Sequence, residues 1–172
     1  EYVTSSLSDE RDPRAFAAAD GSVYVAWWID DVTPRIHFSR RDSGFDGWTI
    51  ARQVAGNGSH PTIAIVDGRV WVAYERDAKL GLRHVIVAQE LPEGGFAKRI
   101  VATSDHNQVI GAELHNDAGR LWVDWRQSSQ EIGYAEWVDG DWSETTTVPL
   151  ENRSWAGEQQ ARRSIRDLLL LR

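Results

Sequence analysis

The residues best suited to chemistry lie where the copies of an internal repeat differ, at the ends of predicted strands. Trp28, Glu75 and Arg126 occupy equivalent positions after three similar apolar runs, and Asp30 and Arg76 lie close by. Asp30 could contact a cation or a sugar hydroxyl, and the two arginines could bind an anion. Charged groups gathered at one edge of a fold would form a ligand-binding rim. We therefore expect these positions to line one rim of the molecule.

Asp124 departs most clearly from the repeat, because the equivalent positions hold Ala26 and Ala73. A carboxylate that faces a packed interface is costly unless it is paired. Arg126 lies two residues further along and on the same side of the predicted strand, which makes it a candidate partner. Asp124 is therefore interpreted either as a structural acid, in a buried ion pair or bonded to the backbone, or as a carboxylate placed to meet substrate.

Two histidines lie in equivalent links between repeats, His60 in "NGSHP" and His106 in "TSDHNQ". Together with Asp105 they could ligate a metal, but the repeat alone explains their spacing. We interpret them as solvated rim residues and predict no metal and no cofactor. The histidines inside predicted strands are interpreted as structural: His37, His84 and His115.

The elements that must position these residues are three copies of one unit of about 48 residues. The copies are marked by "DGSVYVAWWID", "DGRVWVAYERD" and "AGRLWVDWRQS", each followed by a second apolar strand and a further turn. Each unit holds four short strands, A to D, with glycine in the first hairpin turn. Such a period, with four strands per repeat, is typical of a β-propeller blade.

The second copy, "VDGRVWVAYERD", predicts a strand that is apolar on both faces. Val70, Val72 and Tyr74 face one way, and Trp71 and Ala73 face the other. Stacked blades cover both faces of an inner sheet, whereas a sandwich leaves one face polar. Packing between blades, rather than ligand binding, is the interpretation of two equivalent columns: Tyr24, Trp71 and Trp122, and Val25, Val72 and Val123.

The predicted organisation is an all-β chain, with a three-blade propeller segment over 1–150 and a tail over 151–172. The blades are expected at about 13–56, 61–104 and 111–149, and residues 1–8 as the D strand of a preceding blade. The tail predicts a short helix, because four apolar residues recur at helical spacing: Ala161, Ile165, Leu168 and Leu169. Asn152 or Ser154 could cap its start. The helix could cover an open blade or dock a partner, or "LLLL" could begin another A strand.

The turn after the third strand of each unit resembles the Asp-box of BNR or sialidase-like propellers. The segment "SRRDSGFDGWT" carries Ser39, Asp42, Gly44 and Trp48, and shorter remnants follow in "PEGGF" and "DGDW". The resemblance covers about residues 13–148 and implies a propeller that closes with six blades. It also implies an arginine triad, a nucleophile pair and an Arg-Ile-Pro motif, but the first A strand reads "DPRAFAA". We therefore transfer no catalytic residues from that family.

Three blades are too few for a closed ring, since propellers typically have at least four. Two copies could associate head to tail, or a partner chain or further blades could complete the ring. The chain begins at Glu1, so either a leader has been removed or the chain is part of a longer one. We expect a secreted or periplasmic location.

Composition excludes several classes of function. The 172 residues carry a net charge of −7, which argues against nucleic-acid binding. No apolar run approaches the roughly 20 residues of a membrane span. The chain has no cysteine, and therefore no disulfide or thiolate metal site.

These observations favour a non-catalytic propeller module that recognises carbohydrate or a protein partner. One alternative is a sialidase-type glycoside hydrolase completed by further blades or a second copy. Another is a structural subunit of an extracytoplasmic complex that docks through the tail helix.

Overall fold

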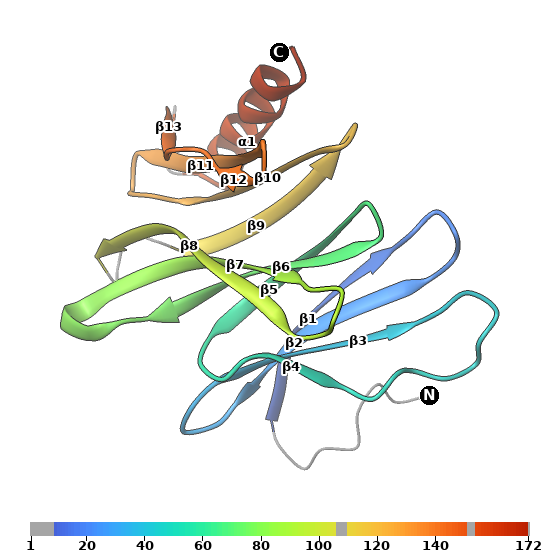
Figure 1. Cartoon of the computed structure of the whole chain (residues 1–172). Helices are drawn as coiled ribbons and strands as arrows, with labels where there is room; N and C mark the ends of the chain where they lie inside the picture. The colour runs from blue at the N-terminus through green and yellow to red at the C-terminus, as the bar shows by residue number, and fades with distance from the viewer. Residues whose placement is uncertain (1–8, 106–109, 151–153, 172) are drawn as a thin grey trace.

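The computed structural model describes residues 9–105, 110–150 and 154–171, which form three antiparallel sheets and a C-terminal helix (Figure 1). Blade 1 contains β1 (Asp9–Ala17), β2 (Val23–Asp30), β3 (Arg35–Arg41) and β4 (Arg52–Ala55). Blade 2 contains β5 (Ser59–Val66), β6 (Arg69–Asp77), β7 (Leu82–Glu90) and β8 (Phe96–Asp105), with a short 3₁₀ turn, η1 (Lys79–Gly81), before β7.

Blade 3 differs at its outer edge. Its inner strands are β9 (Ile110–Asp117), β10 (Arg120–Arg126) and β11 (Glu131–Val138). The fourth strand is divided into β12 (Asp141–Trp142) and β13 (Thr146–Pro149), which both pair with β11. The all-β class with a terminal helix is confirmed, and the three sheets form part of a propeller.

Tight turns connect the A and B strands of blades 2 and 3. Asp67 and Gly68 have φ of 50° and 72°, and Ala118 and Gly119 have φ of 50° and 80°. Two consecutive positive φ values are typical of the type I′ turn, whose twist matches that of the flanking strands. Glycine fits the second position because it has no Cβ to clash there.

The hydrophobic core lies between blades, as the two-faced strand predicts. Val72 and Tyr74 join Tyr24 and Phe38 of blade 1 in one buried cluster. On the opposite face of the same sheet, Trp71 packs in a second cluster that is completed by blade 3. Blade 2 is therefore covered on both sides, so the apolar residues of β6 need no face in contact with water.

The aromatic column of Tyr24, Trp71 and Trp122 is buried, with exposures of 8%, 4% and 3%. Each side chain points to the element that follows: blade 2, blade 3 and the helix α1 (Trp155–Leu170), respectively. The valine column differs at its start, because Val25 is partly exposed while Val72 and Val123 are fully buried.

Helix α1 covers the last blade. The Ser154 hydroxyl caps it by accepting a hydrogen bond of 3.2 Å from the Gly157 amide. Its buried face packs on Trp122 and other residues of blade 3 and consists of Ala161, Ile165 and Leu169. The interpretation of a helix that covers an open blade face is confirmed, and a strand at "LLLL" is wrong, because Leu168–Leu170 continue the helix.

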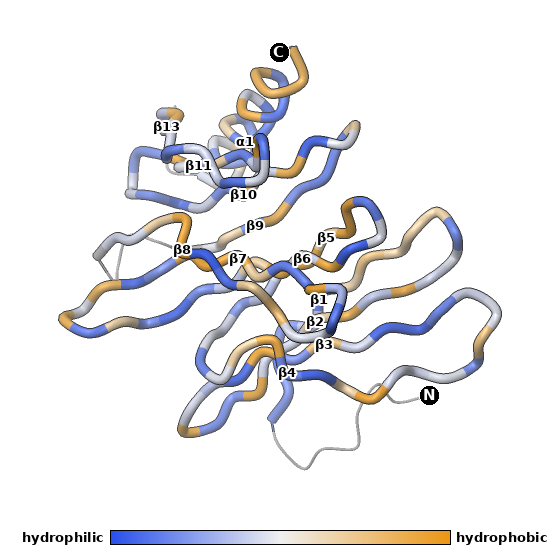
Figure 2. The backbone as a smooth tube through the Cα atoms, viewed as in Figure 1, coloured by the Kyte–Doolittle hydropathy of each residue, from blue (hydrophilic) through white to orange (hydrophobic). Residues whose placement is uncertain are grey.

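One residue of the predicted apolar face lies elsewhere. Leu168 is 47% exposed, because at 100° per residue it turns away from blade 3 while Ile165 and Leu169 face it. The C-terminal end of α1 is consequently hydrophobic around its circumference (Figure 2). Within the described residues, we find no helix with the length and apolarity needed to cross a bilayer.

Candidate functional site

The first strand of each blade carries an irregularity in its pairing, near its start. In β1 the register shifts between Arg11 and Arg14, in β5 between Ser59 and Thr62, and in β9 opposite the segment from Asp124 to Arg126. Two residues on the first strand therefore face one on the second, which defines a β-bulge. The same bulge recurs once per blade.

The leading residue of each bulge has a positive φ. These residues are Asp12 (44°), His60 (51°) and Gly111 (68°). Only Gly111 is a residue type that adopts this conformation freely, and Pro13 and Pro61 follow the other two, which restricts them further. Non-glycine residues in such conformations cluster at functional sites, and bulges re-aim side chains.

The bulges bring Asp12 and His60 together with Trp28. The Trp28 indole Nε1–H donates a hydrogen bond of 3.1 Å to Asp12 Oδ2. His60 Nε2 lies 3.6 Å from the same oxygen, and the Trp28 and His60 ring centroids are 5.6 Å apart. A carboxylate, an imidazole and an indole from two blades thus meet at one rim, which we call the bulge rim.

Arg11 and Asp30 extend the bulge rim. The Arg11 guanidinium pairs with Asp30 at 3.0 Å and with Asp9 at 2.6 Å, and it lies 6.0 Å from the Trp28 ring centroid. The hydrogen bond that Arg11 donates to Asp9 raises the pKa of Arg11, and the negative charge of Asp30 adds to that effect. The predicted candidates Trp28, Asp30 and His60 therefore lie together.

Glu75 occupies the position equivalent to Trp28, but it links two blades. It is 2% exposed, and its Oε1 accepts a hydrogen bond of 2.6 Å from the Gly111 amide in blade 3. Its Oε2 lies 3.1 Å from Arg83 Nη1 and 3.9 Å from His60 Nδ1. The side chain therefore joins the bulge of blade 3 to blade 2, directly beside His60.

Asp124 and Arg126 lie under α1 rather than at the bulge rim. Asp124 is fully buried and forms an ion pair with Arg162 of the helix, and its Oδ2 lies 2.8 Å from His115 Nε2. Arg126 pairs instead with Glu158 of α1 at 2.8 Å. Asp124 is thus part of a buried ion pair, with a partner different from the predicted one, because the helix supplies a closer arginine.

The remaining candidates lie apart from this cluster. Arg76 faces a separate hollow of about 520 Å³, which it lines with residues that include Asn57, Leu80 and His84. His106 falls outside the described residues. Within the described ranges we find no cluster of three acidic or imidazole side chains able to hold a metal ion.

The repeat analysis missed two bulge-rim residues, Arg11 and Asp12, and Asp12 is the one that contacts both Trp28 and His60. A signal for it exists in the sequence, because Asp12-Pro13 and His60-Pro61 both lie near the start of the first strand of a blade. When the repeats are aligned at Asp20 and Asp67, these pairs are one residue out of register, because the chain between paired residues of the A and B strands is one residue longer in blade 1 than in blade 2. Only the strand pairing shows that Asp12 and His60 are equivalent.

The chain matches no protein-family model, and no curated protein is significantly similar to it in sequence. Several solved structures share its fold. The catalytic domain of a Coprinopsis cinerea GH62 α-L-arabinofuranosidase aligns with a TM-score of 0.55 at 10% identity, over 87% of this chain and 55% of its own. The Bacteroides ovatus protein described as xyloglucan PUL GH43B aligns with a TM-score of 0.55 at 14% identity, over 84% and 30%.

A Dyadobacter fermentans protein of unknown function aligns with a TM-score of 0.62 at 13% identity, over 85% of this chain and 53% of its own. This chain thus spans about half the length, or less, of the structures it resembles. At these identities the comparison shows the fold alone, a partial propeller. The glycosidase neighbours are five-bladed, so the resemblance to BNR or sialidase-like propellers holds for the propeller fold and not for that family specifically.

Proposed function

We propose that this chain is part of a propeller that binds carbohydrate at the bulge rim. The observation that carries the proposal is the β-bulge that recurs in each blade with a positive φ at its leading residue. In blades 1 and 2 it places Asp12 and His60 against the Trp28 indole. A carboxylate and an imidazole can bind sugar hydroxyls, while an indole offers a flat surface to the C–H face of a sugar ring. Two of the solved structures with this fold are described as α-L-arabinofuranosidases, which supports the same ligand class.

Binding is favoured over hydrolysis by the state of the carboxylates. A glycosidase needs two carboxyl groups placed about 5–10 Å apart and free to act on the substrate. Glu75 is enclosed, with its oxygens held by a backbone amide and by Arg83. Asp30 is paired with Arg11. Among the described rim residues, Asp12 is the carboxylate best placed to meet a ligand, and it lacks a second free carboxylate beside it.

Further blades are proposed to stack on blade 1. Because α1 covers the free face of blade 3, a second copy cannot place its blade 1 there without displacing the helix. Head-to-tail closure by two copies is therefore disfavoured. A partner chain or additional blades next to β1–β4 would complete a ring without disturbing α1.

The test is titration calorimetry with arabinose-substituted xylan oligosaccharides and xyloglucan oligosaccharides. Trp28→Ala is expected to weaken binding by about tenfold or more, and Asp12→Asn by several-fold, because each removes a contact to the sugar. Trp48→Ala serves as the matched control, since Trp48 is a partly buried tryptophan of the same blade on another edge. Binding that is unaffected by Trp28→Ala would contradict the proposal, and cleavage of the oligosaccharides would favour a hydrolase.

A further inference from the structure

A second group of aromatic side chains lies at the rim opposite the bulges, where the A–B and C–D turns are found. Trp137 and Trp142 are cross-strand partners on β11 and β12 of blade 3, and both are partly exposed. Both rings contact Trp71 of blade 2, with centroid separations of 4.9 and 6.1 Å. The indoles are tilted against one another by 61° to 82°, so they form a corner rather than a stack.

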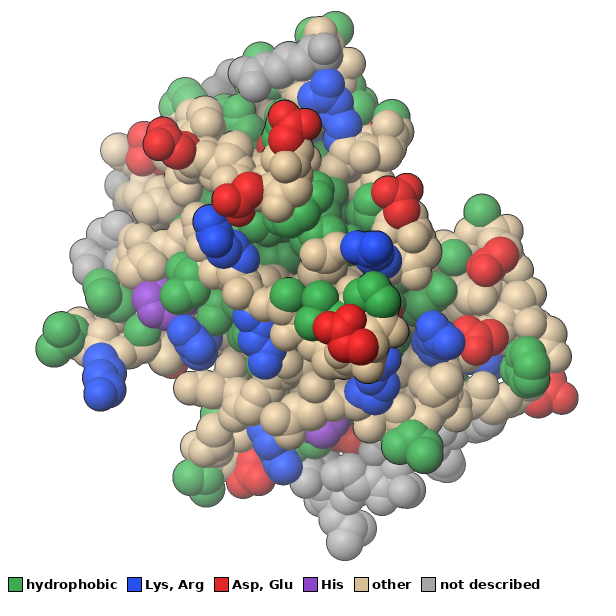
Figure 3. Space-filling model, in the orientation of Figure 1, with side chains coloured by type: hydrophobic (Ala, Val, Ile, Leu, Met, Phe, Trp, Pro, Cys, Tyr) green, Lys and Arg blue, Asp and Glu red, His purple; other side chains and the backbone are tan. Residues whose placement is uncertain are grey.

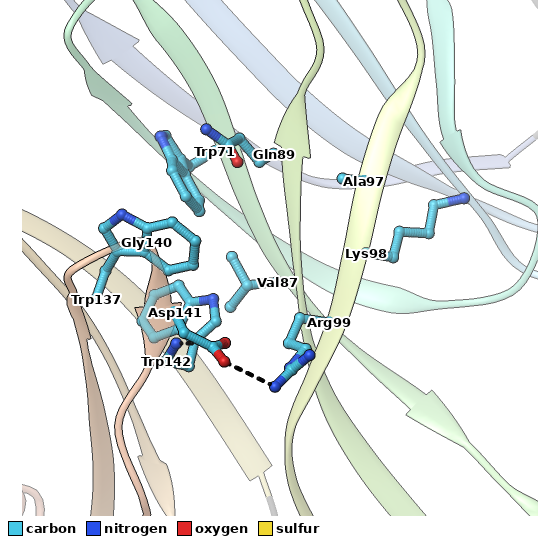
Figure 4. A pocket seen from close by; sticks show the side chains of 10 residues that line it. All are labelled: Trp71, Val87, Gln89, Ala97, Lys98, Arg99, Trp137, Gly140, Asp141 and Trp142. Atoms are coloured by element: carbon cyan, nitrogen blue, oxygen red, sulfur yellow. Dashed lines mark hydrogen bonds and ion pairs between the residues drawn. The ribbon is translucent and has the colours of Figure 1, made fainter.

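This corner borders an open hollow. A cavity of about 230 Å³ lies beside the three indoles. Its wall on the blade 2 side includes Val87, Gln89 and Ala97. Figure 4 shows the indoles on one side and Arg99 on the other, joined to Asp141 across the opening at 3.1 Å. On the face seen in Figure 3, hydrophobic side chains gather in a hollow that is bordered by acidic and basic groups.

A second hollow of about 390 Å³ adjoins the first. It shares Trp71, Gln89 and Trp137 with the first hollow and adds Asp67 and Arg69 from the turn of blade 2. Each cavity is small or modest beside the roughly 300–1,000 Å³ of a typical ligand pocket. Together they form a groove for an extended ligand, with room for one small ring at the tryptophan corner. We call it the tryptophan groove.

The equivalent gap between blades 1 and 2 is closed more tightly. There Phe96 packs edge-on against Phe38 at 6.3 Å, and Arg52 lies over the Phe96 ring and pairs with Glu90. The Arg52 and Glu90 side chains are 38% and 15% exposed, compared with 62% and 61% for Arg99 and Asp141. An arginine–acid pair therefore helps to fill the gap between blades 1 and 2, whereas the pair between blades 2 and 3 spans the entrance of an open hollow.

We propose that the tryptophan groove binds one ring of a neutral carbohydrate at its corner, with the rest of the chain along the adjoining hollow. The Trp137 and Trp142 indoles would contact the C–H faces of the ring. Gln89, Asp141 and Arg99 would bind its hydroxyls, because their groups combine donors and acceptors within reach. The acidic and basic residues around the groove are nearly balanced, which suits a neutral polyhydroxylated ligand better than an ion. This site is separate from the bulge rim, and neither depends on the other.

The test is a titration followed by ¹H–¹⁵N NMR spectra, because each of the nine tryptophans gives its own indole N–H signal. The probes are xyloglucan oligosaccharides, arabinose-substituted xylan oligosaccharides and cellotriose, with signals assigned by single Trp→Phe variants. The expected result is a saturable change in the chemical shifts of the Trp137 and Trp142 indole signals, with the chemical shift of Trp48 unchanged. Trp142→Ala should weaken binding at this site at least tenfold, whereas Trp48→Ala, at the matching position of blade 1, should not.

A second variant guards against loss of folding. Ala97 is exposed and lines the hollow from blade 2, so Ala97→Leu should fill the hollow and abolish the movement of these signals while the urea midpoint stays unchanged. The inference is overturned if none of the three probes moves the Trp137 or Trp142 signal. It is also overturned if only Trp28 responds, a result that would instead support the proposed function at the bulge rim.

Discussion

Asp124 stands where the other two blades have alanine, and the buried charge is neutralised by an arginine from outside the blades. The carboxylate is fully buried and paired with Arg162, whose side chain is 10% exposed and also lies 3.2 Å from Glu113. Removing one member of a buried pair leaves an uncompensated charge, which typically costs about 3–5 kcal/mol. We expect Arg162→Met to lower the free energy of unfolding by that amount in urea titrations. Arg163→Met, one residue along on the exposed face, should change it little.

The Arg162 prediction has an internal check. The double variant Asp124→Leu with Arg162→Met removes both charges and should recover most of the lost stability. If the single and double variants are equally unstable, the ion pair is not the cause of the loss.

His115 makes stability depend on pH. Burial lowers its pKa to about 4; Glu113 opposes this shift and Arg162 reinforces it. Because the folded pKa lies below the unfolded value near 6.5, the unfolded chain binds more protons between these values. Stability is therefore complete above about pH 6.5 and falls as pH decreases towards 4. Since the ring is 31% exposed, we expect a loss on the order of 2 kcal/mol. His115→Gln should flatten this part of a melting-temperature profile, and an unchanged slope would contradict the assignment.

At the scale of the elements, local sequence patterns predict which segments form strands and which face of the sheet each side chain occupies. The alternation in β6 is a property of consecutive residues, so the two-faced strand could be predicted before any contact was known. The bulges could not, because a bulge is an offset between two strands, and the alignment of repeats assumes that offset to be constant.

Close approach between β10 and β11 leads to a prediction at this scale. A Cβ added at Gly133 would lie 2.8 Å from the Trp125 ring, which is fully buried. Gly133→Ala should therefore force a shift of the indole and cost about 1–3 kcal/mol in thermal or urea unfolding. Gly56→Ala is the control, since its Cβ would meet only the flexible end of Gln53 at 3.3 Å. Equal effects of the two variants would show that packing on Trp125 is not the cause.

At the scale of the whole molecule, α1 covers the outer face of blade 3. The helix buries Ile165 and Leu169 on Trp122 and neighbouring residues of blade 3. Deleting residues 151–172 should expose this apolar face together with Asp124, so that the shortened chain self-associates. Light scattering after size exclusion should show a mass above that of the parent chain. Ile165→Asp should act in the same direction, whereas Leu168→Asp, at an exposed position, should not.

The sequence by itself predicted three units of antiparallel strands, the two-faced strand of the second unit and the terminal helix, because these depend on repeat period and side-chain alternation along the chain. Only the tertiary structure decided which polar groups meet. Asp12 contacts His60, Glu75 binds the Gly111 amide, and Asp124 pairs with Arg162, all across 36 or more residues. Repeats show which residues are equivalent, but contact between blades depends on how the sheets stack and where each bulge turns its side chain.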